Sequence, residues 1–490
     1  MLKASTSPVN KTAILAIVLI SFFMVILDNS IIFTGLPAIQ ESTGFSDAGL
    51  AWVGDAYTLV FGGLLMLAAR SADILGRRRL FIIGLVIFTV ASVGVGIAWD
   101  APSVIVARAL QGMGGAIIAP TSLALLTATF EEGRERSRAI ALYAATVGIG
   151  ASAGLVIGGA AVELISWRAG FFLNLPIGVA MLILTARFVH ELPRTPGRFD
   201  VLGAVTSTLG TTLLTYGIIE SGIAGWGSAT TILLLALGVV LLAAFVLCEW
   251  RAAQPILPLR LFASGVRSGS YVVRLLFMGS FMGFFYFTTQ FFQGVLGWNA
   301  LQAGLGFLPM TVVNFAVAMA VSPIIRRIGA LTTLALGIAS TLAGMAWLSA
   351  VQADTSFVVG MAIPMALIGI GQGLALAPMT DYSIHGVTGD DAGAASGLVN
   401  MAQQLGLSIG LAVLVSLTAG VGADLSPANR IAEVTQTGLA GAAGMLVIAL
   451  VVVFAVIFPG SVAARRSAGG VRAGAGEASH ETAVSSVSVD

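Results

Sequence analysis

The chain has 490 residues, of which 57% are hydrophobic and only 10% are charged, and its mean hydropathy is +0.98. Soluble proteins carry about 25% charged residues, so the composition excludes a soluble globular protein and indicates an integral membrane protein. The net charge of +1 leaves no basic surface for nucleic acid. The single cysteine, Cys248, excludes an intramolecular disulfide and any CxxC metal or redox motif.

Long unbroken apolar runs define the predicted membrane spans. A spanning helix needs about 20 apolar residues, whereas a transmembrane barrel shows alternating segments of about ten, so we predict an all-α membrane protein. Residues 459–490 are rich in Gly, Ala and Ser and are predicted to form a disordered cytoplasmic tail. The fourteen predicted spans are 13–36, 48–68, 80–98, 103–126, 138–160, 167–187, 201–220, 229–248, 270–293, 303–322, 332–350, 357–379, 395–419 and 438–458.

Lys and Arg are unevenly distributed between the segments that join these spans. With a cytoplasmic N-terminus, 20 of the 24 fall in cytoplasmic segments, two lie outside (Arg168 and Arg430) and two lie within spans (Arg108 and Arg274). Cytoplasmic loops carry the excess of positive charge in membrane proteins. Both termini are therefore predicted to be cytoplasmic, which an even number of spans also requires.

Three charged residues lie inside the first four spans, all in the outer half of the bilayer: Asp28, Asp55 and Arg108. A charge at a helix centre costs at least about 2.5–3.5 kcal/mol, so it needs a partner, an aqueous cavity or a function. A carboxylate whose surroundings change can bind and release a proton, and no histidine lies in any predicted span. The simpler alternatives are a static Asp–Arg pair that orients helices and, for Asp55, a cap or tether near the outer surface.

The segment between the second and third spans, 69–80, reads Ala-Arg-Ser-Ala-Asp-Ile-Leu-Gly-Arg-Arg-Arg-Leu. Asp73 ends the second span, Gly76 permits a tight turn, and Arg77, Arg78 and Arg79 form a cationic cluster. An acid beside several arginines at a helix junction can hold two bundles in one state and release them in another. The alternative is a positive-inside loop with no further role.

An internal repeat relates the two ends of the chain. Ala119-Pro120 and Ala377-Pro378 are 258 residues apart, and the same offset relates two glycine pairs. The chain is therefore interpreted as six helices, two extra helices and six more. The predicted units are an N-terminal bundle (1–190), two linker helices with a peripheral structural role (191–250) and a C-terminal bundle (251–458). Duplicated halves with a site between them are a common plan of transporters.

Taken together, several segments resemble the major facilitator superfamily and, within it, the fourteen-helix drug:proton antiporter family. The segment 69–80 resembles the superfamily's loop motif, with Ala69 and Ser71 departing from it. The other matching segments are the helix-1 motif from Leu27-Asp28-Asn29-Ser30 to Leu36-Pro37, the helix-4 motif 108–116, the helix-5 antiporter motif 150–159, and Trp167-Arg168 with Asn174-Leu-Pro176.

The helix-5 motif departs from the family at one position. The family normally has Gly-Pro where this chain has Gly154 followed by Leu155. Proline would remove a backbone hydrogen bond and favour a kink. Gly150, Gly154, Gly158 and Gly159 still permit close helix packing, so we expect export but keep inward transport as an alternative.

The second half carries neutral polar and aromatic residues instead of charges. The offset of 258 pairs Asp28 with Tyr286 and Arg108 with Ala366. We therefore expect proton coupling in the first half and apolar substrate binding largely in the second, although aromatic runs also face lipid or neighbouring helices. The predicted cavity residues are Asn29, Tyr286, Gln290, Asn314, Asn400, Gln403 and Gln404. Near span ends, where side chains reach the interface, a structural role is expected for Glu220, Glu249, Arg274 and Asp381.

The resemblance implies efflux of lipophilic drugs, antibiotics or dyes by alternating access, in antiport with protons. Asp28, Arg108 and Asp55 would couple the protons. No cofactor is expected, since transport would be driven by the proton motive force. The sequence contains no Walker A motif for nucleotide binding. The expected partners are a small lipophilic substrate, protons and the lipid bilayer. A functional monomer in a bacterial cytoplasmic membrane is expected.

Two other functions remain open at this stage. One is a carrier of the same fold for a lipid, a siderophore or a metabolite, including inward transport, which Leu155 keeps open. The other is an intramembrane enzyme. Such an enzyme needs a nucleophile with a base or two facing acids, and Asp28 and Asp55 form the only possible pair.

Overall fold

The computed structural model describes residues 10–46, 49–131, 134–191, 200–251, 257–387 and 392–460 of the chain. These residues form helices joined by short connections and contain no strand, which confirms the predicted all-α class. The helices of the first half are α1 (Lys11–Thr43), η1 (Gly49–Ala51), α2 (Trp52–Leu75), α3 (Arg77–Gly96), α4 (Ala101–Thr129), α5 (Arg134–Leu164), α6 (Trp167–Phe172) and α7 (Asn174–Phe188). Those that follow are α8 (Val201–Ala224), α9 (Ala229–Arg251), η2 (Leu259–Ala263), α10 (Gly265–Gly294), α11 (Ala300–Gly306), α12 (Leu308–Ile328), α13 (Ala330–Leu348), η3 (Phe357–Ala362), α14 (Ile363–Ser383), α15 (Ala392–Leu417), α16 (Pro427–Val452) and η5 (Val453–Ile457).

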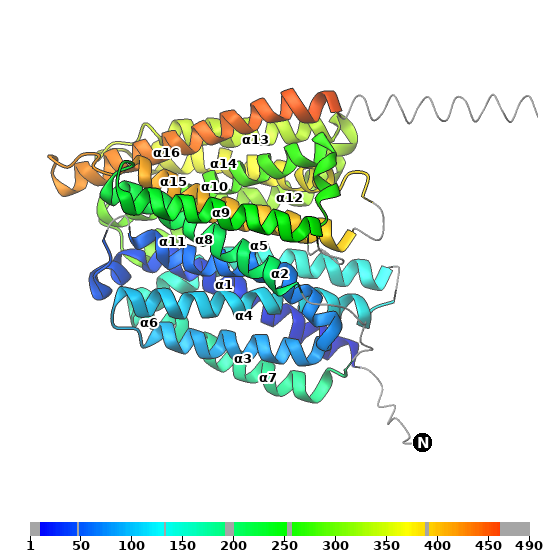
Figure 1. The fold of residues 1–490 in the computed structure, drawn as a ribbon. Coiled ribbons are helices and arrows are strands. Elements are labelled where there is room, and N and C mark those ends of the chain that lie inside the picture. The colour runs from blue at the N-terminus through cyan, green and yellow to red at the C-terminus, as the bar shows by residue number, and fades with distance from the viewer. Residues whose placement is uncertain are drawn as a thin grey trace, which may run out of the picture.

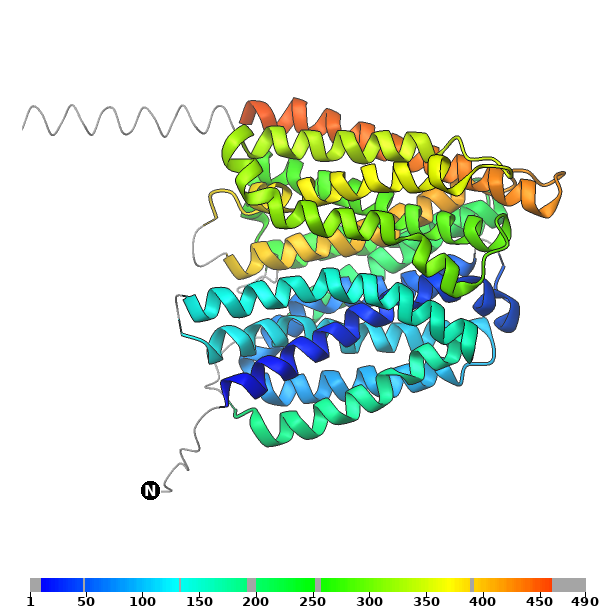
Figure 2. The same cartoon turned by 180° about the vertical axis from the view of Figure 1, so that it is seen from behind.

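The long helices lie side by side along one common direction (Figure 1). α1 packs against α4, α5 and α7 in the first half, and α10 packs against α14, α15 and α16 in the second. The described chain begins and ends at the same end of the molecule, as the view from behind also shows (Figure 2). This placement of the ends requires an even number of crossings.

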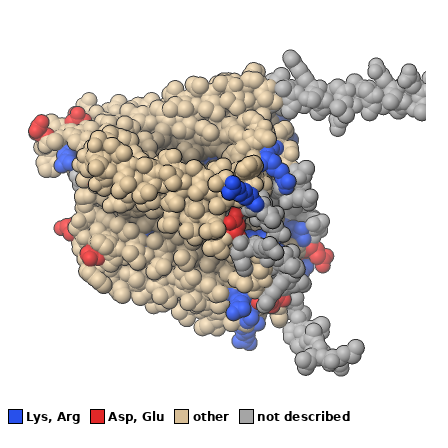
Figure 3. All heavy atoms as spheres, viewed as in Figure 1, with Lys and Arg blue, Asp and Glu red and all other residues tan. Residues whose placement is uncertain are grey.

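Each predicted span corresponds to one helix or, at 48–68, 167–187, 303–322, 357–379 and 438–458, to two consecutive helical segments. Most of these helices extend beyond the predicted span. Among the described residues, 13 helices are long and apolar enough to cross a membrane. α5 has 31 residues, but its described apolar stretch is only Ala153–Leu164, so the count of fourteen stays a prediction. On the face shown in Figure 3, the charged side chains gather toward the two ends and leave a broad uncharged band between them, as a bilayer requires.

The two helices after the first half are not equivalent. α9 packs mainly on α8, whereas α8 also packs against α2 of the first half and α15 of the second. The hydroxyls of Ser221 on α8 and Ser416 on α15 lie 2.8 Å apart and share a hydrogen bond. A purely peripheral role therefore fits α9 better than α8. The division at 190, 250 and 458 stays a prediction, and residues 461–490 of the predicted tail lie outside the described residues.

The two halves also meet directly at the end of the bundle opposite the two termini. The side-chain amide of Gln293 on α10 donates to the carbonyl of Thr34 on α1 at 2.9 Å. The rings of Phe33 and Phe285 stack with their centroids 4.9 Å apart. α11 packs against α5 close to these contacts.

Candidate functional site

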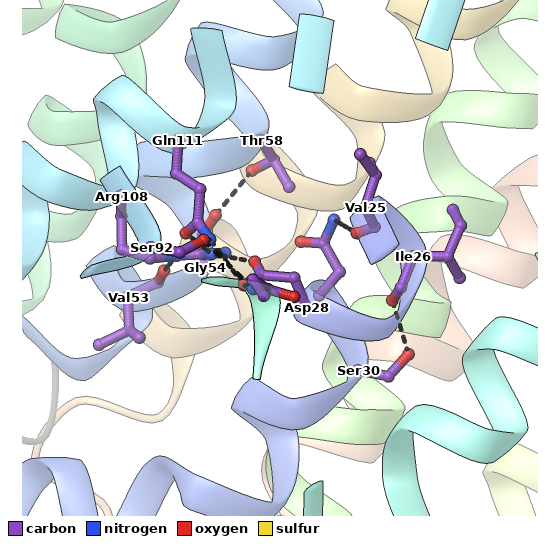
Figure 4. Close-up of polar contacts among 12 residues, drawn as sticks. Val25, Ile26, Asp28, Ser30, Val53, Gly54, Thr58, Ser92, Arg108 and Gln111 are labelled. Carbon is purple, nitrogen blue, oxygen red and sulfur yellow. Dashed lines mark hydrogen bonds and ion pairs between the residues drawn. The ribbon is translucent and has the colours of Figure 1, made fainter. Parts of the chain in front are cut away.

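Asp28 lies at the centre of a buried polar network in the first half (Figure 4). Its side chain has no exposed surface. Its Oδ2 accepts a hydrogen bond from Arg108 Nη1 at 2.6 Å. Its Oδ1 accepts from Gln111 Nε2 at 2.6 Å and from Asn174 Nδ2 at 2.7 Å. Both carboxylate oxygens are therefore satisfied without water.

Arg108 connects this network to the neighbouring helices. It too is fully buried, and Nη1 also donates to Oε1 of Gln111 at 2.6 Å. Its Nε donates to the carbonyl of Val53 on α2 at 2.9 Å, and its guanidinium lies 4.5 Å from the ring centroid of Tyr57, within the range of a cation–π contact. Asp28 and Arg108 are thus brought together, and α1, α2 and α4 are joined through them.

A second layer of polar groups holds the amides in place. The hydroxyl of Ser92 on α3 accepts from Gln111 Nε2 at 2.6 Å and from Asn174 Nδ2 at 3.2 Å. Sequence reasoning does not single out Ser92, Gln111 or Asn174 as site residues. The available signal is that Gln111 and Asn174 lie inside the quoted motif segments. Nothing in the sequence places Ser92 beside them.

Asp55 does not join the Asp28 network. It is fully buried in the first turn of α2, and the hydroxyl of Ser408 on α15 faces it. Neither carboxylate oxygen has a hydrogen-bond partner among the described residues, so the cap or tether considered for Asp55 is not observed. The helix N-terminus offers partial electrostatic compensation. Because Asp28 and Asp55 occupy separate environments, they do not form a pair of facing catalytic acids.

The segment 69–80 is a sharp corner rather than a loop. α2 ends at Leu75, α3 begins at Arg77, and Gly76 between them adopts φ +107°. Arg77 donates to the carbonyl of Ala124 near the end of α4 at 3.2 Å, and Arg78 donates to the carbonyl of Ala186 near the end of α7 at 2.9 Å. Arg79 is exposed, and the side chain of Asp73 lies outside the described side chains. The cations thus bind the carbonyl-rich ends of two helices.

The glycines of the helix-5 motif face two different partners. Gly150, Gly154 and Gly158 lie against α1, where a Cβ built on Gly158 would be 2.7 Å from the Cα of Ile31. A Cβ built on Gly159 would lie 2.5 Å from the carbonyl oxygen of Ala300 on α11, in the other half. From the other side, Gly304 packs against the carbonyl of Leu155. The motif therefore permits close approach both within the first half and between the halves.

The predicted cavity residues do not share one environment. Tyr286 and Gln404 are buried, Asn29, Gln290, Asn314 and Gln403 are half-buried, and Asn400 is exposed. Asn29 and Asn400 donate to carbonyls four residues back, those of Val25 at 3.3 Å and Ser396 at 3.0 Å. Gln404 packs beside Gly62 of α2.

Two residues expected to reach the interface are instead buried. Arg274 is only 4% exposed and Glu249 only 3%. Glu249 accepts a hydrogen bond from the backbone N–H of Leu257 at 2.9 Å, and Arg274 donates to side chains of α14 and α15. The prediction that they snorkel was wrong because neighbouring segments cover both side chains. Glu220 is half-buried, and Asp381 is exposed.

This fold, with two helical halves and a buried charge network beside their interface, defines a multi-pass membrane transporter. The chain belongs to the Major Facilitator Superfamily, whose sequence profile matches residues 18–411. This membership makes it a transporter and not an enzyme. The family consists of secondary transporters that generally work without a cofactor, and the described residues contain no group of three or more His, Cys, Asp or Glu able to hold a metal ion.

Comparisons with individual proteins agree with this family. The chain is 40% identical to the cephamycin export protein CmcT of Amycolatopsis lactamdurans over 456 residues, which covers 91% of this chain and 93% of that protein. It is 36% identical to the puromycin resistance protein pur8 of Streptomyces alboniger, covering 83% and 81%. Its fold resembles the crystal structure of a bacterial homologue of the human lysosomal transporter Spinster, with a TM-score of 0.66, 14% identity, and coverage of 91% and 97%.

Proposed function

We propose that this protein exports lipophilic antibiotics, drugs or dyes across the bacterial cytoplasmic membrane in exchange for protons, by alternating access. Relatives that are named for cephamycin export and puromycin resistance support drug efflux. The buried Asp28–Arg108 pair is the observation that supports proton coupling.

Protonation of Asp28 would disturb the whole network. Neutralising Asp28 leaves the buried guanidinium of Arg108 without its counterion, and loss of one partner of a buried ion pair costs about 3–5 kcal/mol. This free-energy cost of an unpaired buried guanidinium falls if α1 and α4 move apart, because water or another group can then solvate Arg108. The proton on Asp28 is thereby linked to the relative positions of α1, α2 and α4, which is the requirement for coupling.

Asp55 is proposed as a second proton-carrying group. It faces Ser408 at the contact between α2 and α15, so its charge acts where the two halves meet. Arg108 donates to the carbonyl of Val53, two residues away in the same turn. A movement of Arg108 in the Asp28 network can therefore shift the backbone next to Asp55, without a direct contact between the two acids.

The corner formed by Gly76, Arg77, Arg78 and Arg79 is proposed to gate the cytoplasmic end, together with Asp73. The arginine contacts to α4 and α7 support this role, since they connect the α2–α3 corner to helices that also carry or contact the Asp28 network. The four glycines of α5 are proposed as the surface on which the outer seal forms and opens. We further propose that a single copy of the chain performs transport, with substrate, protons and lipid as its only partners.

The proposed function is tested with purified protein in liposomes that contain a trapped pH-sensitive dye. Ethidium, puromycin and a cephamycin are added in turn, and proton movement is recorded for the wild type, for Asp28→Asn and for Asp354→Asn. Asp354 is an exposed acid far along the chain from the network and serves as the matched control. Substrate-triggered proton movement in the wild type and in Asp354→Asn, with none in Asp28→Asn, is the expected result.

Two results would contradict the proposal in different ways. If folded wild-type protein moves no protons with any of the compounds, proton-linked drug efflux is wrong and a lipid or metabolite becomes the substrate to test. If Asp28→Asn works as well as the wild type, efflux stands but Asp28 has no part in the coupling.

A further inference from the structure

Among the described residues, the groups that hold the buried cation Arg274 are all neutral. Arg274 is the tenth residue of α10 and is 4% exposed. Nη1 donates to Oε1 of Gln403 at 3.1 Å, and Nη2 donates to Oγ1 of Thr380 at 2.5 Å. Nε is buried and has no hydrogen-bond partner among the described residues.

In the part of the chain that the structure describes, the helices packed around α10 offer no acid that pairs with this charge. α15 contains no acidic residue. On α14, Asp381 is exposed, and on α16, Glu433 is half-exposed in the segment that follows the outer loop. On α1, Asp28 is already paired with a different arginine, and Glu41 is exposed.

Arg108 shows how the chain neutralises another buried guanidinium. There, Asp28 supplies a full counterion at 2.6 Å. Arg274 has no such partner among the described residues, and its counterpart in the first half at the offset of 258 is Ala16. A charge inside the membrane is expensive and is retained for a function. The missing negative charge therefore points to a ligand.

The unused hydrogen-bond donors of the guanidinium define the chemistry of that ligand. Arginine binds carboxylates through two parallel N–H···O bonds. In Arg274 the Nε–H is unused, and each terminal nitrogen has a second hydrogen beyond the one given to Gln403 or Thr380. These unused hydrogens are the donors that a carboxylate reaching the guanidinium would bind, while the hydrogen bonds to Gln403 and Thr380 are kept.

We propose that Arg274, together with Gln403 and Thr380, binds the acidic group of the transported compound, so that the substrates of this protein include lipophilic carboxylates. This inference rests on the proposed export function. Arg274 lies about 14 Å from the cytoplasmic start of α10 at 1.5 Å per residue, whereas Asp28 lies about 26 Å from the start of α1. A substrate taken from the cytoplasm therefore reaches Arg274 before it reaches the depth of the Asp28 network.

The test measures binding to the full-length protein in phosphatidylcholine nanodiscs by quenching of tryptophan fluorescence. The probes are pyrenebutyrate and naproxen, each paired with its uncharged methyl ester. We expect each acid to bind more tightly than its ester. Arg274→Gln should weaken acid binding at least about tenfold while leaving ester binding within about twofold, since only the charged hydrogen bonds are lost.

Gln403→Glu tests the same site without removing the arginine. It places a carboxylate beside Nη1 of Arg274, so the protein supplies its own counterion. Acid binding should fall about tenfold, ester binding should persist, and thermal stability should not decrease. If Arg274 had a structural role only, Arg274→Gln would lose acid and ester binding together, and Gln403→Glu would keep both.

Three results would overturn the inference. The first is a wild type that binds neither acid better than its ester, and the second is unchanged acid binding in Gln403→Glu. The third concerns lipid, because an anionic headgroup offers the same chemistry. If phosphatidylglycerol nanodiscs abolish acid binding, a lipid occupies Arg274 instead of the substrate. If instead the wild type transports no compound at all, the proposed function fails rather than this site.

Discussion

The buried pair of Asp28 and Arg108 should show strong energetic coupling. Asp28→Asn removes the counterion and replaces one acceptor by an NH2 donor, which must face either Nη1 of Arg108 or the donating amides of Gln111 and Asn174. Because neither partner has any exposed surface, each single substitution, Asp28→Asn or Arg108→Gln, should destabilise the fold by about 3–5 kcal/mol. The double variant buries no unpaired charge and should be more stable than the sum predicts, by about 1–3 kcal/mol.

The assay is a double-mutant cycle on purified protein, with unfolding in detergent followed by far-UV circular dichroism. The matched control is the ion pair of Lys11 and Glu135, which has the same kind of N–O contact at 2.8 Å but side chains that are 40% and 62% exposed. Its cycle should show no coupling at high salt, since exposed charges are screened. Additivity within about 0.5 kcal/mol at Asp28 and Arg108 would refute the reasoning.

Three further predictions concern positions outside that pair. Asp55→Asn should leave thermal stability unchanged or raised, because an unpaired buried carboxylate is removed, and should lower the number of protons moved per substrate in dye-loaded liposomes; a large loss of stability would show that the carboxylate is structurally required. Gly159→Val should keep the protein folded but reduce transport more than about tenfold, because the new side chain meets the carbonyl of Ala300 in the other half; normal transport would mean that this contact does not form during the cycle. Gly76→Ala should lower stability by about 1–3 kcal/mol, since φ is +107° and the Cβ would meet Glu191; an unchanged melting temperature would contradict this.

Much of the architecture could be predicted from the sequence because it depends on local composition. Each apolar run of about 20 residues must form a helix in lipid, where backbone groups have no other partners. The segment 69–80 was predicted as a loop with a tight turn at Gly76; the turn is present, but Gly76 alone joins the helices and Arg77 already belongs to α3. Helix ends were less predictable, because helices such as α1 and α10 continue past the apolar residues on which the prediction was based.

The candidate site could be predicted only in part. The rarity of charges inside the membrane singles out Asp28, Asp55 and Arg108, but periodicity cannot say which of two acids meets the arginine. Asp28 and Arg108 are 80 residues apart, and their contact depends on how α1 packs on α4. The sequence likewise placed Arg274 near a span end, where a side chain normally reaches water.

The membrane class, the helical fold and the few residues costly enough to need a function could be read from the amino-acid sequence, because these follow from the transfer free energies of individual side chains. The packing of the helices is what gives Asp28 its counterion, leaves Asp55 without a hydrogen-bond partner among the described residues, and places two neutral groups on Arg274. These differences arise from which helices pack together, and a buried charge takes its properties from the few groups within about 4 Å of it.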